Sequence, residues 1–155
     1  MKVGVYISNL NKIGGVETFA INLCNRTGFD LIYSAASIEG LKKLKYNFYN
    51  HRDCEKDYDV VILATVWKPH PNFNKLRAKK YIQMVHADYT AYIEEWNFKY
   101  EKYPKTTHHV CVGNHVAKMF TKATGYNYDK VIHNLLEPYK PKKIKSKKLS
   151  FITLS

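Results

Sequence analysis

Two adjacent glycines, Gly14 and Gly15, stand between an apolar run at residues 3–7 and the start of an amphipathic segment. Glycine has no Cβ, so the backbone at such a pair can approach a ligand closely. The first N–H groups of a following helix have no intrahelical partner and, with the helix dipole, favour an anion. This order predicts a phosphate-binding loop at Gly14, Gly15 and Val16. A plain turn between a strand and a helix explains the pattern equally well.

His86 ends another apolar run, at residues 80–86. Open α/β sheets bind ligands at the carboxyl ends of their strands, so this histidine is expected at a ligand-binding edge. A single histidine there can also be no more than a polar loop residue. The other histidines lack a carboxylate or cysteine at metal-ligand spacing, and we expect no metal site.

A third candidate is a segment in which aromatic residues recur at helical spacing, beginning with Tyr89, Tyr92 and Trp96, with Lys99 and other lysines between them. The packed face of a helix is the simpler interpretation. Tyrosine and tryptophan beside lysine also suit a membrane interface, and sugar rings stack on aromatic faces. We therefore keep Tyr89, Tyr92, Trp96 and Lys99 as candidates for contact with an acceptor or a membrane.

The elements that would position these residues alternate along the chain. Strand-like runs are followed by helical patterns, which indicates an α/β fold with a mostly parallel sheet and helices on both faces. Asn114 is expected to cap the last helix and Gly125 to end it. The predicted strands are residues 3–7, 29–34, 46–49, 58–65, 80–86, 108–112 and 130–133, and the predicted helices start near residues 16, 38 and 114.

The 155 residues are 45% hydrophobic, which excludes a disordered chain and fits one ordinary domain. The net charge is +12, but six lysines between residues 140 and 148 carry half of it. A lysine run with prolines reads first as a solvated linker and secondly as a site of attraction to anionic lipids. The three cysteines are widely spaced, so a reducing compartment fits better than a disulfide framework. Without a signal-like start or a long apolar run, we expect a cytoplasmic protein.

The sequence predicts a domain at residues 1–134, a basic linker at 135–148 and the start of a truncated C-terminal domain at 149–155. The last segment reads as a new strand after the linker. A final edge strand of the same sheet is the alternative.

Four of these segments, in this order, resemble the N-terminal half of glycosyltransferases of the GT-B fold, in particular the large retaining family known as family four. The resemblance spans essentially the whole chain. At the last segment, where family members usually carry Pro-Asn-Gly, His133 and Leu135 flank the asparagine instead. The segments are Gly14-Gly15-Val16-Glu17-Thr18 with Asn22-Leu23 behind it, Val85-His86-Ala87-Asp88, Val112-Gly113-Asn114-His115-Val116-Ala117, and Val131-Ile132-His133-Asn134.

The resemblance implies a two-domain enzyme that transfers a sugar from a nucleotide-sugar donor to a saccharide or lipid-linked acceptor, as in the synthesis of bacterial surface polysaccharides or glycolipids. Gly14, Gly15 and Val16 would lie beneath the donor phosphates, and His86 would contact the donor sugar, with Asp88 orienting it or the acceptor. The donor is a substrate, and no separate cofactor is implied. The nucleotide clamp belongs to the C-terminal domain, so this chain alone is expected to be inactive.

Two other classes of protein compete with this interpretation. A dinucleotide-dependent oxidoreductase would need a G-x-G-x-x-G turn and an acidic residue ending the second strand, and the chain has neither. A noncatalytic basic module that binds nucleic acid or an anionic membrane remains the alternative. The gathering of lysines in one linker argues against a nucleic-acid surface. Peripheral attachment at the inner face of the cell membrane stays compatible with either class.

Overall fold

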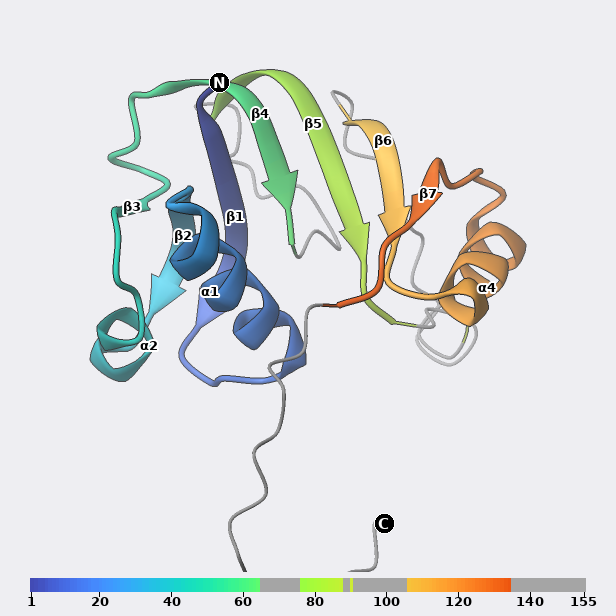
Figure 1. Ribbon diagram of the computed structural model, residues 1–155, viewed down its shortest axis with the longest axis horizontal. Helices are drawn as coiled ribbons and strands as arrows, with labels where there is room; N and C mark the ends of the chain where they lie inside the picture. Colours follow the sequence, from blue (N-terminus) through green and yellow to red (C-terminus); the bar gives the residue numbers. More distant parts are fainter. Residues whose placement is uncertain (65–75, 88–89, 91–105, 135–155) are drawn as a thin grey trace, which may run out of the picture.

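The computed structural model describes residues 1–64, 76–87, 90 and 106–134. Within them a twisted sheet carries helices on its two faces (Figure 1). The segments predicted as an aromatic-basic contact, a linker and the start of a second domain lie outside the described residues. The elements are β1 (Val3–Leu10), α1 (Gly15–Thr27), β2 (Asp30–Ala36), α2 (Ile38–Lys42), β3 (Phe48–Asn50), β4 (Asp57–Leu63), β5 (Arg77–Val85), β6 (Thr106–Cys111), α4 (Asn114–Thr124) and β7 (Lys130–Val131).

The strands form one sheet in the order β3-β2-β1-β4-β5-β6-β7, and every neighbouring pair is parallel. The order turns back at β1, because β2 and β3 lie on one side of it and β4 to β7 on the other. This is the arrangement of a Rossmann-like fold, whose ligand crevice lies outside the carboxyl ends of the strands at the reversal. The predicted fold class is confirmed. The predicted strand boundaries agree with the observed ones to within three residues.

Helix α1 covers one face of the sheet. Ala20, Ile21 and Cys24 are its buried residues, and they pack with Val5 and Ile7 of β1. The helix ends where Gly28 takes φ 72°, a left-handed conformation that suits glycine, and the Gly28 N–H donates to the Cys24 carbonyl at 2.8 Å.

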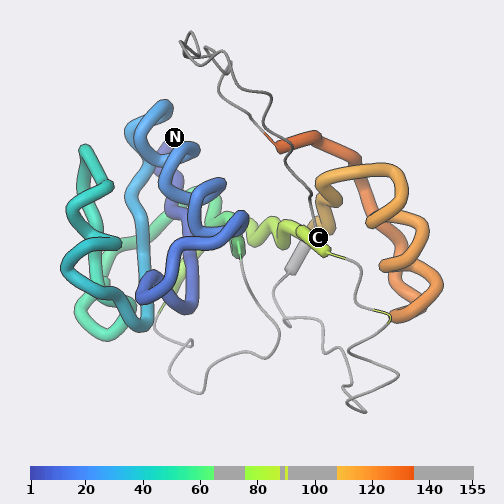
Figure 2. Tube along the Cα trace, turned by 90° about the horizontal axis from the view of Figure 1, so that it is seen from below, coloured from blue at the N-terminus to red at the C-terminus, as the bar shows by residue number. Residues whose placement is uncertain are grey.

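Helix α4 covers the opposite face. Ala117 and Phe120 are buried against Val85 and Cys111, at the end of the sheet away from β3 (Figures 1 and 2). Side chains alternate between the faces of a strand, so the residue that follows Val85 is directed to the face of α1.

The N-cap prediction for α4 was wrong. Gly113 is the N-cap and Asn114 the first helical residue, with no side-chain cap hydrogen bond. An extended Gly113 (φ −170°) brings the chain directly from β6 into the helix. Asn114 therefore lies one residue beyond the N-cap position and cannot act as the cap. The predicted end is confirmed, since Gly125 has φ 74°.

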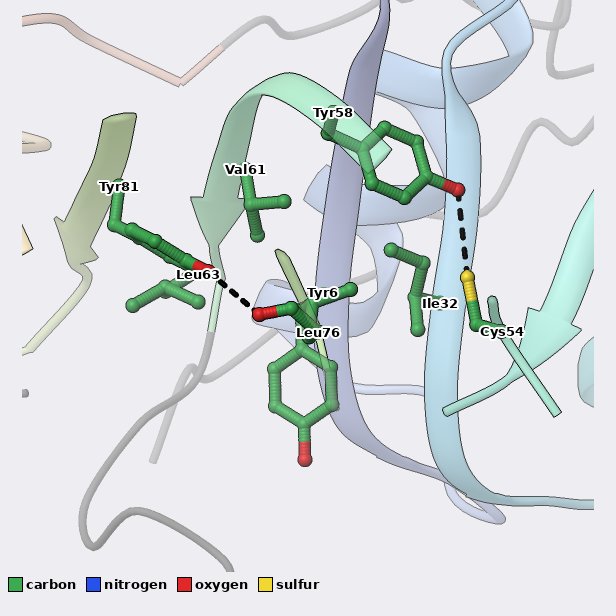
Figure 3. Close-up of a cluster of buried hydrophobic side chains, with 8 residues drawn as sticks. All are labelled: Tyr6, Ile32, Cys54, Tyr58, Val61, Leu63, Leu76 and Tyr81. Carbon is green, nitrogen blue, oxygen red and sulfur yellow. Dashed lines mark hydrogen bonds between the residues drawn. The ribbon is translucent and has the colours of Figure 1, made fainter. Parts of the chain in front are cut away.

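The face opposite α1 has its own apolar core, which centres on β1 and β4 and includes three tyrosines (Figure 3). Two of the tyrosine hydroxyls have buried partners. Tyr81 donates to the Leu76 carbonyl at 2.6 Å, and the Tyr58 hydroxyl lies 3.6 Å from the sulfur of Cys54. The rings therefore fill the core without burying an unsatisfied hydroxyl. Across the described residues, no helix has the length and apolar character needed to span a membrane.

Candidate functional site

The glycine loop follows β1 directly and is tied to the first turn of α1. The Gly14 N–H donates to a carboxylate oxygen of Glu17 at 2.8 Å, and the Gly14 carbonyl accepts from the N–H and hydroxyl of Thr18, at 3.0 and 2.7 Å. Gly14 has φ −107°, so the loop does not need glycine for a left-handed backbone. The space around Gly15 is the informative feature, because a Cβ built there would meet nothing within 4 Å.

An open cavity of about 280 Å³ lies against this loop and the first two turns of α1. It combines the loop backbone, an aromatic ring and two side-chain amides, and its described lining carries no charged side chain. Asn134, which follows β7, joins residues that lie more than a hundred positions earlier in the chain. The lining consists of Ile13, Gly14, Gly15, Thr18, Phe19, Asn22 and Asn134.

His86, immediately after β5, packs against Phe19, whose ring lines the cavity. The two rings meet edge to face with centroids 4.8 Å apart, and Phe19 is itself part of the lining. Burial lowers the pKa of His86 to about 4, so its imidazole is neutral at pH 7. The buried Nε2 atom has no hydrogen-bond partner among the residues that the structure describes. A neutral ring can donate or accept one hydrogen bond there, but it carries no positive charge toward an anion.

The structure brings together only part of the predicted site. Gly14 and Gly15 line the cavity and His86 adjoins it. The side chain of Val16 packs against the core of α1 and β1, and Val16 is not part of the described cavity lining. Asp88, Tyr89, Tyr92, Trp96 and Lys99 lie outside the described residues.

Sequence reasoning left five lining residues without a role, and the two with polar amide side chains are Asn22 and Asn134. Asn22 occupies a half-buried position of an amphipathic helix, and the pattern of α1 shows only that such a position borders the core. Asn134 follows the last strand of the described sheet, and no local pattern connects it with α1. Only its place after β7, opposite the glycine loop, could have indicated a role.

One N–H group of the glycine loop is already hydrogen-bonded to a carboxylate of the protein itself. A helix N-terminus attracts an anion, and here the carboxylate of Glu17 holds the Gly14 N–H. An incoming phosphate would meet the remaining amides of the first turn beside this negative charge. The described lining adds no cation, so these residues alone offer a weak anion site and a good site for hydroxyl groups.

A second polar cluster lies at the amino ends of the strands, away from the cavity. Asp30, nearly buried, accepts from the Lys56 ammonium at 3.1 Å and from the Tyr58 hydroxyl at 3.0 Å, and Lys56 also donates to Tyr49. Burial, with the Cys54 and Asp30 contacts, raises the pKa of Tyr58 far above its usual value. The cluster joins β2, β3 and β4 and acts structurally. In the described part of the chain, no group of three or more His, Cys, Asp or Glu residues is arranged to hold a metal ion.

Comparison of the chain with models of known protein families gives no match, and comparison with curated proteins gives none either.

Proposed function

We propose that this chain is the N-terminal, acceptor-side half of a glycosyltransferase with two Rossmann-like domains. One observation carries the proposal. Three segments that follow the carboxyl ends of parallel strands, namely Gly14-Gly15 after β1, His86 after β5 and Asn134 after β7, gather around or beside one cavity. Parallel strands end at the same edge of a sheet, and ligand sites of such folds lie there.

The residues at this cavity suit a polyhydroxylated substrate. The amides of Asn22 and Asn134 both donate and accept hydrogen bonds, as sugar hydroxyls require. Phe19 supplies an apolar ring, and the His86 ring behind it is neutral. In the proposed reaction the nucleoside diphosphate leaves the anomeric carbon with the bonding electrons, and the acceptor oxygen forms the new bond and loses its proton. Gly14 and Gly15 form one wall beside the departing phosphates.

The rest of the enzyme is part of the proposal. The nucleotide clamp lies in a second domain that follows a linker at residues 135–148, and Asp88 together with the segment that begins at Tyr89 completes the acceptor side. The donor is a nucleotide sugar, no other cofactor is needed, and the acceptor is a saccharide or a lipid-linked saccharide of a bacterial surface polymer. The isolated chain is therefore expected to bind nucleotide sugars weakly or not at all.

The test uses the protein from the complete open reading frame that encodes this chain. It is incubated with a panel of nucleotide sugars and saccharide acceptors, and release of the nucleoside diphosphate is measured with the transferred sugar. We expect turnover with one donor, and a loss of at least about tenfold in kcat/KM for His86→Ala and Asn22→Ala, because both disturb substrate positioning. Asn127→Ala, at an exposed position after α4, is the control.

Two results would contradict the proposal. The first is the absence of turnover with every donor in a folded protein. The second is tight nucleic-acid binding that weakens steeply with salt, which would favour the noncatalytic basic module.

A further inference from the structure

The outer edge of the sheet carries a surface in which large apolar side chains and lysines are exposed together. Ile38, Tyr46 and Phe48 are 74%, 52% and 39% exposed, although residues of these types are usually buried. Exposed lysines of α2 and of the segment that enters β3 stand between them in the sequence. Figure 1 shows α2 and β3 at this edge of the sheet. We call this the α2–β3 surface, and it consists of Ile38, Lys42, Lys43, Lys45, Tyr46 and Phe48.

The backbone of this surface is held in place by contacts with the rest of the domain. Leu44 packs into the core beneath α1, so its neighbours Lys43 and Lys45 remain outside. The Asn25 side chain of α1 donates to the Lys43 carbonyl and accepts from the Lys45 N–H, both at 2.8 Å. A partner that binds here therefore meets a fixed backbone and need not order it first.

Both ends of the surface are anchored as well. The Leu31 N–H of β2 donates to the Asn47 carbonyl at 3.0 Å, and Phe48 is paired with Leu31 in the sheet. At the other end, Ser37 accepts from the Gly40 N–H and its hydroxyl donates to the Leu10 carbonyl. Ile38 and Lys42 are four residues apart in α2, so they share one face of that helix.

The charge of the surface is positive and unpaired. None of Lys42, Lys43 and Lys45 forms an ion pair with any described residue, and Glu39 is the one exposed carboxylate of α2. Lys79, by contrast, is paired with Asp59 at 2.7 Å. The ammonium groups of Lys42, Lys43 and Lys45 are therefore exposed along the same edge of the sheet as Ile38, Tyr46 and Phe48.

We propose that the α2–β3 surface docks on an anionic membrane. Lysines near a negatively charged leaflet gain electrostatic attraction, and apolar and aromatic side chains beside them enter the boundary between head groups and acyl chains. The highly exposed aliphatic side chain of Ile38 favours a membrane over a nucleic acid as the partner. It would contact nothing apolar on a phosphate backbone, whereas it suits the boundary between lipid head groups and acyl chains. This is a surface different from the aromatic-basic segment that begins at Tyr89.

The α2–β3 surface extends along the edge of the sheet from one end of the strands to the other. Ser37 and Gly40 contact Leu10, the last residue of β1, and the glycine loop begins a few residues later. Ile38 therefore lies toward the cavity end of the sheet, whereas Phe48, which pairs with Leu31 near the start of β2, lies at the amino ends of the strands. The docking proposal does not depend on the proposed function and is tested without any sugar.

The experiment measures co-sedimentation of the full chain with vesicles of phosphatidylcholine alone or mixed with phosphatidylglycerol. We expect binding only to the mixed vesicles. Replacing the three lysines (Lys42→Gln, Lys43→Gln, Lys45→Gln) is expected to lower the partition coefficient at least about tenfold at low salt. Ile38→Ser with Tyr46→Ser should lower the part of the binding that persists at high salt, where charge is screened.

The matched control replaces three exposed lysines at the other end of the sheet (Lys118→Gln, Lys122→Gln, Lys130→Gln), and a further control replaces Lys143, Lys145 and Lys147 by Gln. All of these positions are exposed or outside the described residues, and equal thermal midpoints check the fold. The proposal is overturned if the α2–β3 variant binds as well as the matched control. It is also overturned if the 143–147 variant alone abolishes binding, or if the α2–β3 lysines affect binding of an oligonucleotide and not of vesicles.

Discussion

At the scale of single residues, Gly15 combines a position at the start of a helix with a place in the wall of the cavity. It is the first residue of α1, lines the cavity and has no atom within 4 Å of the place where a Cβ would be. A Cβ there would therefore meet no atom of the described residues, and neither packing nor a left-handed backbone requires glycine at this position.

We predict that Gly15→Ala stabilises the domain by about 0.5–1 kcal/mol in urea denaturation, because alanine loses less backbone entropy than glycine on entering a helix. If the proposed function is correct, the same change should lower the sugar-transfer activity, since Gly15 lines the cavity and a methyl group there narrows it. Gly113→Ala, at the start of α4 and also free of contacts, is the control for activity. Unchanged activity in Gly15→Ala would remove the glycine pair from the site.

The imidazole ring of His86 both packs against Phe19 and stays neutral at pH 7. Its edge-to-face contact with Phe19 supports the cavity wall, and its burial holds the imidazole neutral by lowering the pKa to about 4. Because the unfolded chain takes up a proton at a higher pH than the folded chain does, acidification favours unfolding.

The prediction that follows concerns stability between pH 6.5 and 5, above the range in which most carboxylates titrate. The His86 contribution to stability is complete above pH 6.5 and falls as the pH drops toward 4, with a slope that approaches about 1.4 kcal/mol per pH unit. The free energy of unfolding of His86→Phe, measured in urea across this window, should depend less on pH than that of the wild type. His133→Phe is the control at an exposed histidine. Parallel curves for wild type and His86→Phe would contradict the assignment.

At the scale of elements, two strands begin with an aspartate that is paired with a cation, but in different surroundings. Asp30 starts β2 and accepts two hydrogen bonds in a nearly buried position, whereas Asp57 starts β4 and meets Arg77 at 2.9 Å with both side chains largely exposed. Water screens the second pair more strongly than the first, in which the Asp30 side chain is 11% exposed. The two ion pairs should therefore differ in what they contribute to holding the strands.

Asp30→Asn is expected to lower the free energy of unfolding by about 1–3 kcal/mol, because it leaves Lys56 and Tyr58 with a weaker buried acceptor. The matched change Asp57→Asn should stay within about 0.5 kcal/mol of the wild type. Thermal and urea denaturation at pH 7 measure both. Equal effects of the two substitutions would show that the Asp30 cluster does not hold β2 to β4.

At the scale of the whole molecule, the middle of the sheet and its edges differ in how they are held. β1 is paired on both sides and its first five residues are buried. β3 and β7 are short, contain no fully buried residue and, among the strands that the structure describes, each pair with one neighbour. Opening β1 requires breaking the pairing with both neighbours and the cores on both faces. Opening an edge strand breaks one ladder.

We predict that backbone amides of β1 and β4 exchange hydrogen only by global unfolding, whereas those of β3 and β7 exchange at least about tenfold faster through local opening. Hydrogen exchange followed by NMR at pH 7 measures this directly. Raising the urea concentration should accelerate the slow group strongly and the fast group weakly, and uniform behaviour of all four strands would contradict the prediction.

The sequence by itself determined the α/β class, the parallel sheet, the strands to within a few residues and the glycine that ends α4. It also placed Gly14, Gly15 and His86 at the carboxyl edge of the sheet. Apolar periodicity and glycine positions record burial and local backbone shape, and these are local properties. Only the tertiary structure decided that Asn22 and Asn134 share a cavity, that Phe19 links this cavity to His86, and that Glu17 holds the Gly14 N–H. It also decided that α2 and β3 expose lysines beside apolar side chains. The cavity, the Phe19–His86 contact and the exposed edge depend on strand order and on residues far apart in the chain, which no local pattern encodes, and the Glu17 bond depends on which way one side chain turns.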